Sequence, residues 1–319
     1  MTRPLHAAAF AVLLLAETAL AQTYPSRPIE MIVPIAPGGG MDVQARLLAE
    51  LVEPELKQKI VAVNRPGAGG TIGVGLVSKA APDGYTIGAV WSGPLTASPH
   101  SQPVPYGLDD YVPVIQFSKA PFVVCAPPEF PASGGAELVA HLKQHPDHYT
   151  YGNEGAGGTL HLGAERIFGA LGVRVRAVPF SGAADTLRNF LGGHVSLYAG
   201  GITSILPHMK SGKAKCLLLT SAARNAVFPQ AAGLDELGVA NAETVFWRAI
   251  IAPRGTPPEI VQRLEAAYRS AIQGKRFQDM LSGLGEASST LSGAGLAQFI
   301  REEHAALGRL ARQAGVTRP

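Results

Sequence analysis

The stretch IEMIVPIAPGGGMD, residues 29–42, decides the fold. Its apolar residues 29–35 indicate a largely buried strand, and glycines 38–40 let the backbone turn tightly. Asp42 is the expected N-cap of a helix that follows. The free N–H groups and positive dipole end of such a helix suit an anion such as a carboxylate. The alternative is a connecting turn in which the glycines only satisfy geometry.

The next segments extend this unit into an α/β sheet. Residues 59–63 predict a second strand, a second glycine loop covers residues 64–73, and residues 85–90 predict a third strand. Alternating strands and helices indicate a parallel sheet, whose loops at the carboxyl ends of the strands bind ligands. The loops do not fit nucleotide motifs, because Ile72 occupies the place of the third glycine of a dinucleotide fingerprint.

The second half of the chain repeats the motif of strand, glycine turn, polar residue and helix. A strand at 149–151 leads into the glycine loop 152–161, where Thr159 is a plausible cap. A strand at 175–180 leads into a helix for which Asp185 is the simplest N-cap. A second lobe built like the first is therefore expected.

Two segments carry the chain between the halves. Residues 113–117 and 121–126 are predicted as strands broken by proline, and residues 244–253 as a strand that returns to the first half. Two crossings of this kind predict a hinge with domain closure. Trp247 either lines the cleft or fills the hinge core, and the hinge core is favoured.

The first residues have the pattern of an export signal. Arg3 and His6 precede an apolar run over residues 7–15, and Ala19-Leu20-Ala21 forms an A-x-A cleavage site. A signal peptide over residues 1–21 and a periplasmic mature chain are expected; a buried first helix is the alternative.

Composition narrows the function classes. The net charge is +3 with 16% charged residues and no basic run, so the chain lacks the electrostatic footprint of a nucleic-acid-binding protein. The two cysteines, Cys125 and Cys216, lie in apolar strand-like runs. They can pair in an oxidising compartment, but two buried, unpaired thiols are the favoured expectation.

Several motifs together resemble one protein family. They are YPSRPI at 24–29, VNRPGAGG at 63–70, APDGYT at 81–86 and APRGTPP at 252–258. With these runs the chain resembles the Bug-type periplasmic solute-binding proteins, the receptor subunits of tripartite tricarboxylate transporters, over essentially the whole mature chain.

The resemblance implies a two-lobed α/β periplasmic-binding-protein (Venus-flytrap) fold, each lobe a mostly parallel sheet flanked by helices. Residues 22–120 and 248–319 would form lobe 1 and residues 121–247 lobe 2, with the hinge near 118–124 and 244–250. The protein would act as a monomer that captures a small carboxylate in the cleft and delivers it to a membrane permease. No cofactor, metal or nucleic acid is expected.

The resemblance also implies ligand-binding positions in the loops that face each other across the cleft. The expected ligand-binding residues are Pro37, Gly38, Gly39, Gly40, Met41, Asp42, Trp91, Asn153, Gly155, Gly157, Thr159, His161, Ala183, Ala184, Asp185 and Tyr198. Three positions depart from the family pattern: Ser181, Asp185 and Asn189 stand where relatives usually have Lys, Pro and an acid. The departures put the usual ligand set in doubt.

Two other functions are weaker fits. An exported hydrolase acting on a small ester or amide would need a nucleophile, but Ser181 follows Phe180 and lacks the preceding glycine of a G-x-S-x-G elbow. His141 and His145 have the spacing of metal ligands on a helix, but Pro146 ends that helix and no cysteine or carboxylate cluster joins them. A solvated helix end is expected there.

Overall fold

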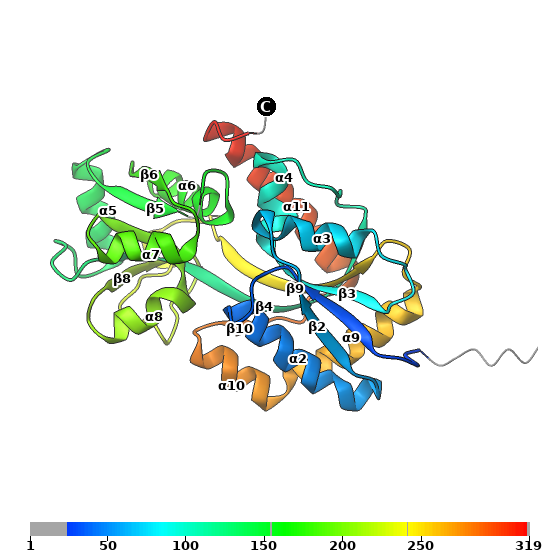
Figure 1. Cartoon of the computed structure of the whole chain (residues 1–319). Coiled ribbons are helices and arrows are strands. Elements are labelled where there is room, and N and C mark those ends of the chain that lie inside the picture. The colour runs from blue at the N-terminus through cyan, green and yellow to red at the C-terminus, as the bar shows by residue number, and fades with distance from the viewer. Residues whose placement is uncertain (1–23, 154, 241, 318–319) are drawn as a thin grey trace, which may run out of the picture.

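The computed structural model describes residues 24–153, 155–240 and 242–317. The predicted signal peptide, residues 1–21, lies outside the described residues. Two lobes lie side by side and are joined by the long strands β4 and β9 (Figure 1). In the described part of the chain no helix is long and apolar enough to cross a membrane.

The first lobe is built on a parallel sheet. Strand β1 (Ile29–Val33) lies between β2 (Ile60–Asn64) and β3 (Thr86–Trp91) and pairs parallel with both. Its helical elements are α2 (Gly40–Leu56), η1 (Ala68–Gly70), α3 (Thr71–Ser78), η2 (Gly93–Ala97), α4 (Ser98–Ser101), α9 (Pro258–Gln273), α10 (Lys275–Gly283) and α11 (Gly293–Gln313).

Two apolar clusters cover the two faces of this sheet. Met31 points to the cluster that contains Leu48 of α2 and Leu264 of α9. The next residue, Ile32, points to the cluster that contains Val74 of α3 and Leu296 of α11. Successive side chains of a strand point to opposite faces, so a strand whose successive residues are both apolar needs helices on both sides.

The second lobe repeats this plan. Strand β5 (Thr150–Asn153) pairs parallel with β6 (Arg176–Pro179) and β7 (Leu197–Gly201). Its other elements are α5 (Gly135–Gln144), α6 (Thr159–Leu171), α7 (Ala183–Leu191), α8 (Ile202–Lys210), β8 (Lys215–Leu219) and η3 (Asp235–Leu237). One cluster packs α5 and α6 on the sheet, and another packs α7 and α8 on its other face.

One continuous strand, β4 (Tyr111–Ala126), connects the lobes. Its first part pairs antiparallel with β9 (Val245–Pro253), and its last residues pair with β7 and β8. The prediction of two strands broken by proline is wrong. Pro113 lies at a register shift and Pro121 at the point where β4 leaves β9, and proline is tolerated at such irregular positions. The short β10 (Ala287–Ser288) also pairs with β4.

The two cysteines form a disulfide. Cys125 of β4 and Cys216 of β8 are paired residues of neighbouring strands, and both are buried. The favoured expectation of two unpaired thiols is wrong, because sequence spacing gave no information on which strands are adjacent. The bond lies entirely within the second lobe.

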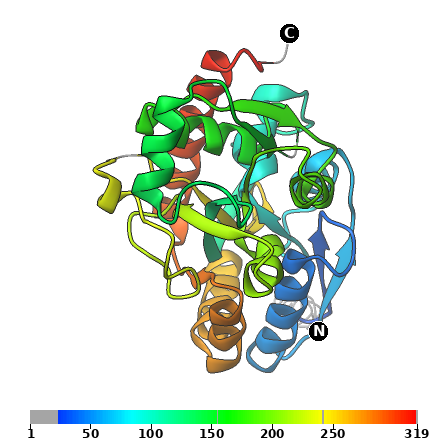
Figure 2. The same cartoon turned by 90° about the vertical axis from the view of Figure 1, so that its left-hand side faces the viewer.

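The C-terminal helix α11 reaches across to the second lobe. Its core residues Leu296 and Ile300 belong to the first lobe, but Leu307 and Ala311 pack with Leu162 of α6. Figures 1 and 2 both show the red end of this helix beside the green helices of the second lobe. We call this contact between α6 and α11 the seam.

Candidate functional site

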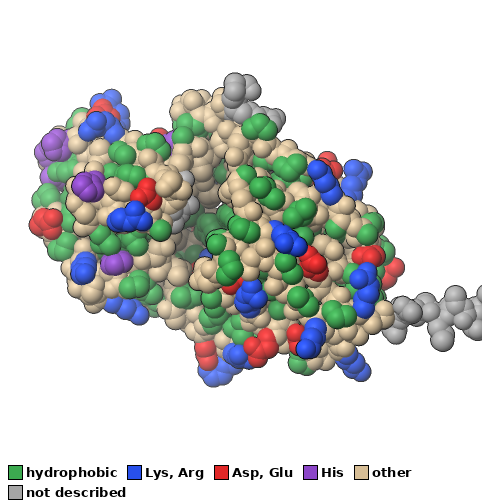
Figure 3. All heavy atoms as spheres, viewed as in Figure 1, with side chains coloured by type: hydrophobic (Ala, Val, Ile, Leu, Met, Phe, Trp, Pro, Cys, Tyr) green, Lys and Arg blue, Asp and Glu red, His purple; other side chains and the backbone are tan. Residues whose placement is uncertain are grey.

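A cavity of about 340 Å³ lies between the two lobes, where the space-filling view shows a hollow (Figure 3). Both lobes and both connecting strands, β4 and β9, contribute to it. Its walls are Ile35, Gly40, Met41, Trp91, Ala120, Pro121, Phe122, Leu160, Gly201, Ile202, Thr203, Ser204, Phe246, Arg248 and Glu286. The volume is at the lower end of the range for small-molecule sites.

The first glycine loop brings α2 to the cavity, and the Asp42 carboxylate holds this loop. The prediction that Asp42 is the N-cap is wrong: Gly39 is the N-cap and Asp42 is the third helical residue. Its buried carboxylate accepts from the Gly38 N–H (3.0 Å), Arg46 Nε (3.0 Å) and Asn64 Nδ2 (2.8 Å). Burial opposes ionisation, but these three bonds together lower the pKa of Asp42.

The glycine loop of the second lobe is held in the same way. His161 is the third residue of α6, and its Nδ1 accepts from the Gly157 N–H at 3.0 Å. Because a protonated imidazole has no acceptor, this bond requires neutral His161, and burial lowers its pKa accordingly. Asn153 Oδ1 accepts from the Gly155 N–H at 2.9 Å. His161 and Asn153 are almost fully buried, so they position the loop.

The start of α7 follows the same pattern. Asp185, the third helical residue, accepts from the Ser181 N–H at 3.4 Å, and glycine is the N-cap. The predicted N-cap roles of Asp185 and Thr159 are therefore wrong, since Gly182 and Gly158 occupy those positions. Each N-cap is a glycine, although the extended backbone of Gly158, with a φ of −70°, is one that any residue adopts.

The capping pattern leaves the first N–H groups of the helices free of side-chain caps. In α2 the first intrahelical bond runs from the Val43 N–H to the Gly39 carbonyl, and in α6 from the Leu162 N–H to the Gly158 carbonyl. Within the described residues no side chain caps Gly39, Gly158 or Gly201 of α8. Three helix starts therefore present backbone donors and positive dipole ends toward the cavity.

The predicted site residues divide into three groups. Gly40, Met41 and Trp91 line the cavity. The loop residues Pro37, Gly38, Gly39, Gly155, Gly157 and Thr159 lie just before or at the starts of α2 and α6, where Asp42, Asn153 and His161 fix the backbone. Ala184, Asp185 and Tyr198 are not among its described lining residues, and the side chain of Ala183 lies outside the described part of the chain.

Two of these outlying residues have partners within the second lobe. The Asp185 carboxylate bonds to Arg188 Nη1 at 3.0 Å and to Ser181 Oγ at 3.1 Å. Tyr198 is 1% exposed and packs beside Phe190 in the core of this lobe. Its neighbour Leu197 points to the opposite face of the sheet, so strand alternation alone removes Tyr198 from the cavity.

Sequence reasoning missed the residues that form the cavity floor. Helix α8 was not predicted because it begins directly after Gly201, the last residue of β7, with no connecting loop, and it contributes Ile202, Thr203 and Ser204. Arg248 was also missed, although a charged residue inside the apolar strand 245–253 was a visible signal. Trp247 is fully buried and packs against Phe299, which places it in the core of the first lobe.

Polar side chains of both lobes meet on the cavity floor. Arg248 Nη1 donates to Glu286 Oε2 at 2.5 Å, and Gln44 Nε2 donates to the same oxygen at 2.9 Å. Thr203 of the second lobe donates to Glu286 Oε1 at 3.1 Å. Arg248 Nη1 also donates to Ser118 Oγ at 3.0 Å. Glu286 is thus bonded to both lobes.

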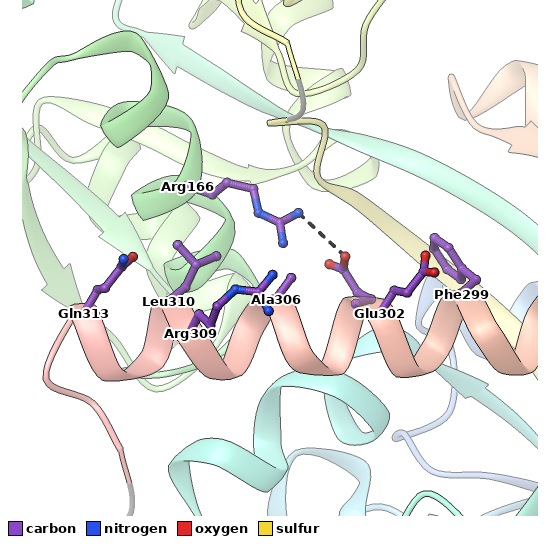
Figure 4. A pocket seen from close by; sticks show the side chains of 8 residues that line it. Arg166, Phe299, Glu302, Ala306, Arg309, Leu310 and Gln313 are labelled. Carbon is purple, nitrogen blue, oxygen red and sulfur yellow. Dashed lines mark ion pairs between the residues drawn. The ribbon is translucent and has the colours of Figure 1, made fainter.

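A second hollow, of about 460 Å³, lies along α11 at the seam (Figure 4). Arg166 lies 3.6 Å from Glu303 Oε2 and donates to the Glu243 carbonyl at 3.0 Å. Burial raises the pKa of Glu303, and Arg166 only partly offsets this. Glu302 and Arg309 also line the hollow. The hollow is larger than the interlobe cavity, and the Arg166–Glu303 pair makes it a contact between α6 and α11.

Two lobes, two crossing strands and a cavity lined by helix starts from both sides define a solute-binding receptor. The chain belongs to the tripartite tricarboxylate transporter receptors: the TctC family model, described as the tripartite tricarboxylate transporter family receptor, matches residues 44–316. The resemblance to Bug-type proteins and the two-lobed fold are confirmed.

Known relatives match along most of the chain. Protein BugT of Bordetella pertussis is 34% identical over 268 residues, which cover 83% of this chain and 82% of that protein. The structure of the periplasmic binding protein BugD is 31% identical with a TM-score of 0.76, covering 93% of this chain and 100% of that one. R. palustris Rpa4515 with adipate is 29% identical with a TM-score of 0.79, covering 92% and 99%.

These comparisons decide between the two function classes. The family consists of solute receptors of a tripartite transporter, and the matching structures are periplasmic binding proteins. The chain is a solute-binding receptor of this kind and not an enzyme, so the hydrolase alternative is set aside.

Proposed function

We propose that the interlobe cavity binds a small organic carboxylate through backbone N–H groups at the helix starts. The observation that carries this proposal is the convergence of α2, α6 and α8 from two lobes on one cavity, each with a glycine N-cap. Charge-assisted bonds from N–H groups to a carboxylate are strong and strengthen when water is excluded. The adipate named with Rpa4515 is a carboxylate of this kind.

The proposed binding elements are the loop over residues 37–41, Trp91 and the loop over residues 155–159. Asp42, Asn153 and His161 are proposed to act on the ligand through the backbone they hold. Ala183, Ala184, Asp185 and Tyr198 are left out of the site.

The proposed function also includes export of the receptor and delivery of its ligand. We propose that residues 1–21 are removed on export to the periplasm and that the monomer delivers its ligand to membrane permease subunits. Residues 22–120 with 248–319, and residues 121–247, are the proposed lobes, and the hinge lies near 118–124 and 244–250. The apolar clusters, which cover residues 29–117 with 247–300 and residues 120–242, support this division except at its edges, where Ala120 packs with the second lobe and Trp247 with the first.

A thermal-shift screen of residues 22–319 against mono-, di- and tricarboxylates, amino acids and amides tests the proposal. A ligand well above its Kd adds about 3 kcal/mol and raises the midpoint by several degrees. Ser204→Trp fills the cavity and should abolish the shift, whereas Ser211→Trp, at the exposed end of the same helix, should keep it. A carboxylate shift that survives Ser204→Trp would place the site elsewhere.

A further inference from the structure

Arg248 is a buried cation in the cavity wall with only part of its guanidinium in use. The residue is 7% exposed and lines the cavity. Its Nη1 serves both protein acceptors, Glu286 and Ser118. Nε is buried without a partner, and the side-chain bonds of Arg248 to described residues all come from Nη1.

The unused edge has the geometry of an anion site. The guanidinium is planar, and the N–H groups of Nε and Nη2 point in parallel from one of its edges. Together they can therefore bind both oxygens of a carboxylate. A buried donor without an acceptor destabilises a protein. An acceptor brought by a ligand removes this cost.

Arg248 lines the same cavity as the helix starts of the proposed site. Thr203 of α8 bonds to Glu286, the partner of Arg248. A Cβ built on Gly40 of α2 would lie 3.8 Å from Thr203 Cγ2. The start of α2 and the Thr203–Glu286–Arg248 chain of contacts are thus neighbours in the cavity wall.

The charges of the floor limit the charge of the ligand. Among the lining residues that the structure describes, only Arg248 and Glu286 are charged, and they compensate each other. A first anionic group gains from the guanidinium and the helix dipoles. A second meets the fixed charge of Glu286, whose side chain is 1% exposed and therefore poorly screened.

The remaining walls are apolar and partly aromatic. The Arg248 guanidinium lies 4.9 Å from the Phe246 ring centroid, and Phe246 lies edge-on to Phe122 at 6.2 Å. Trp91, Leu160 and other apolar residues complete the surface. These walls suit an apolar body with one acidic end.

We propose that Arg248 is the specificity-determining residue of this cavity and that its Nε–Nη2 edge binds the acidic group of a monoanionic organic acid with an apolar body. The inference rests on the proposed function and narrows its ligand class. Glu286 acts as the element that disfavours a second acidic group.

Isothermal titration of residues 22–319 tests the inference with two matched pairs, hexanoate against adipate and benzoate against terephthalate. The wild type should bind the monoacid of a pair about tenfold or more tightly than the diacid. Glu286→Gln keeps the shape and removes the charge, so it should narrow or reverse this ratio. Compared with Glu286→Gln, the double variant Arg248→Gln/Glu286→Gln should bind the monoacids about tenfold or more weakly.

The variants are chosen to keep the fold intact. Arg248→Gln alone would leave the buried Glu286 carboxylate without its cation, so the double variant replaces it. Glu286→Gln still offers Arg248 a carbonyl acceptor and is used alone. Arg276→Gln removes one exposed cation at a distant pair with Glu50 and should leave the ratio unchanged. If the double variant unfolds, the ratio of monoacid to diacid affinity in Glu286→Gln tests the inference by itself.

Three results would overturn the inference: diacids bound as tightly as monoacids by the wild type, an unchanged ratio in Glu286→Gln, or a folded double variant that matches Glu286→Gln. Absence of binding for all four acids would also overturn it. The proposed function is judged separately, by the wider carboxylate screen.

Discussion

Removal of the Cys125–Cys216 disulfide should destabilise the second lobe by several kcal/mol. The two residues are 91 apart in sequence, and closing a loop of this length restricts the unfolded chain by about 4.6 kcal/mol at 25 °C on the chain-entropy relation. Measured disulfides contribute about 2–5 kcal/mol. We therefore expect Cys125→Ala/Cys216→Ala to lower the free energy of unfolding by about 3–5 kcal/mol.

Urea unfolding of the oxidised chain, the reduced chain and the double variant measures this effect. The free energy should fall equally on reduction and in the variant, and the slope against urea should rise because the unfolded chain becomes less compact. Reductant should not change the variant further. Two titratable thiols in the denatured, unreduced protein, or an unchanged urea midpoint on reduction, would refute the reasoning and restore the expectation of two free cysteines.

Three further changes test the loops. Asp42→Ala leaves three donors without their acceptor and should cost about 2–3 kcal/mol in urea unfolding; an unchanged midpoint would remove its role in holding the loop. The stabilisation from neutral His161 is present above its unfolded pKa of about 6.5 and is lost as pH falls through the lowered folded pKa. In the wild type, the protection of the Gly157 amide against hydrogen exchange should therefore fall between pH 7 and 5. In His161→Asp it should stay constant, because a carboxylate remains an acceptor over this range, and persistence of the wild-type pH dependence would contradict this. Gly70→Ala introduces a Cβ 2.4 Å from the Trp91 ring at a φ of 93°, which should cost about 1–3 kcal/mol and shift the indole fluorescence; an unaltered spectrum would argue against displacement.

The sequence was sufficient for the lobes because alternating apolar strands and glycine loops are local signals. Only part of the site could be predicted from the sequence. The glycine loops near Gly40 and Gly157 were found from the local sequence pattern. The roles of Asp42 and His161 were not, because each side chain accepts from the N–H four residues earlier, whereas the capping rules predict that the N-cap side chain bonds to the helix start. Arg248 became a site residue only through β4, β9 and Glu286, which are far apart in sequence.

The seam between α6 and α11 gives this receptor a second way to tune its response. Any rotation that parts the lobes also shifts Leu162 against Leu307 and alters the Arg166–Glu303 pair. The apparent affinity of a receptor scales with the fraction of molecules in the binding-competent conformation. Substitutions at the seam can therefore adjust the concentration at which the receptor fills, while the cavity walls independently determine which molecule fills it.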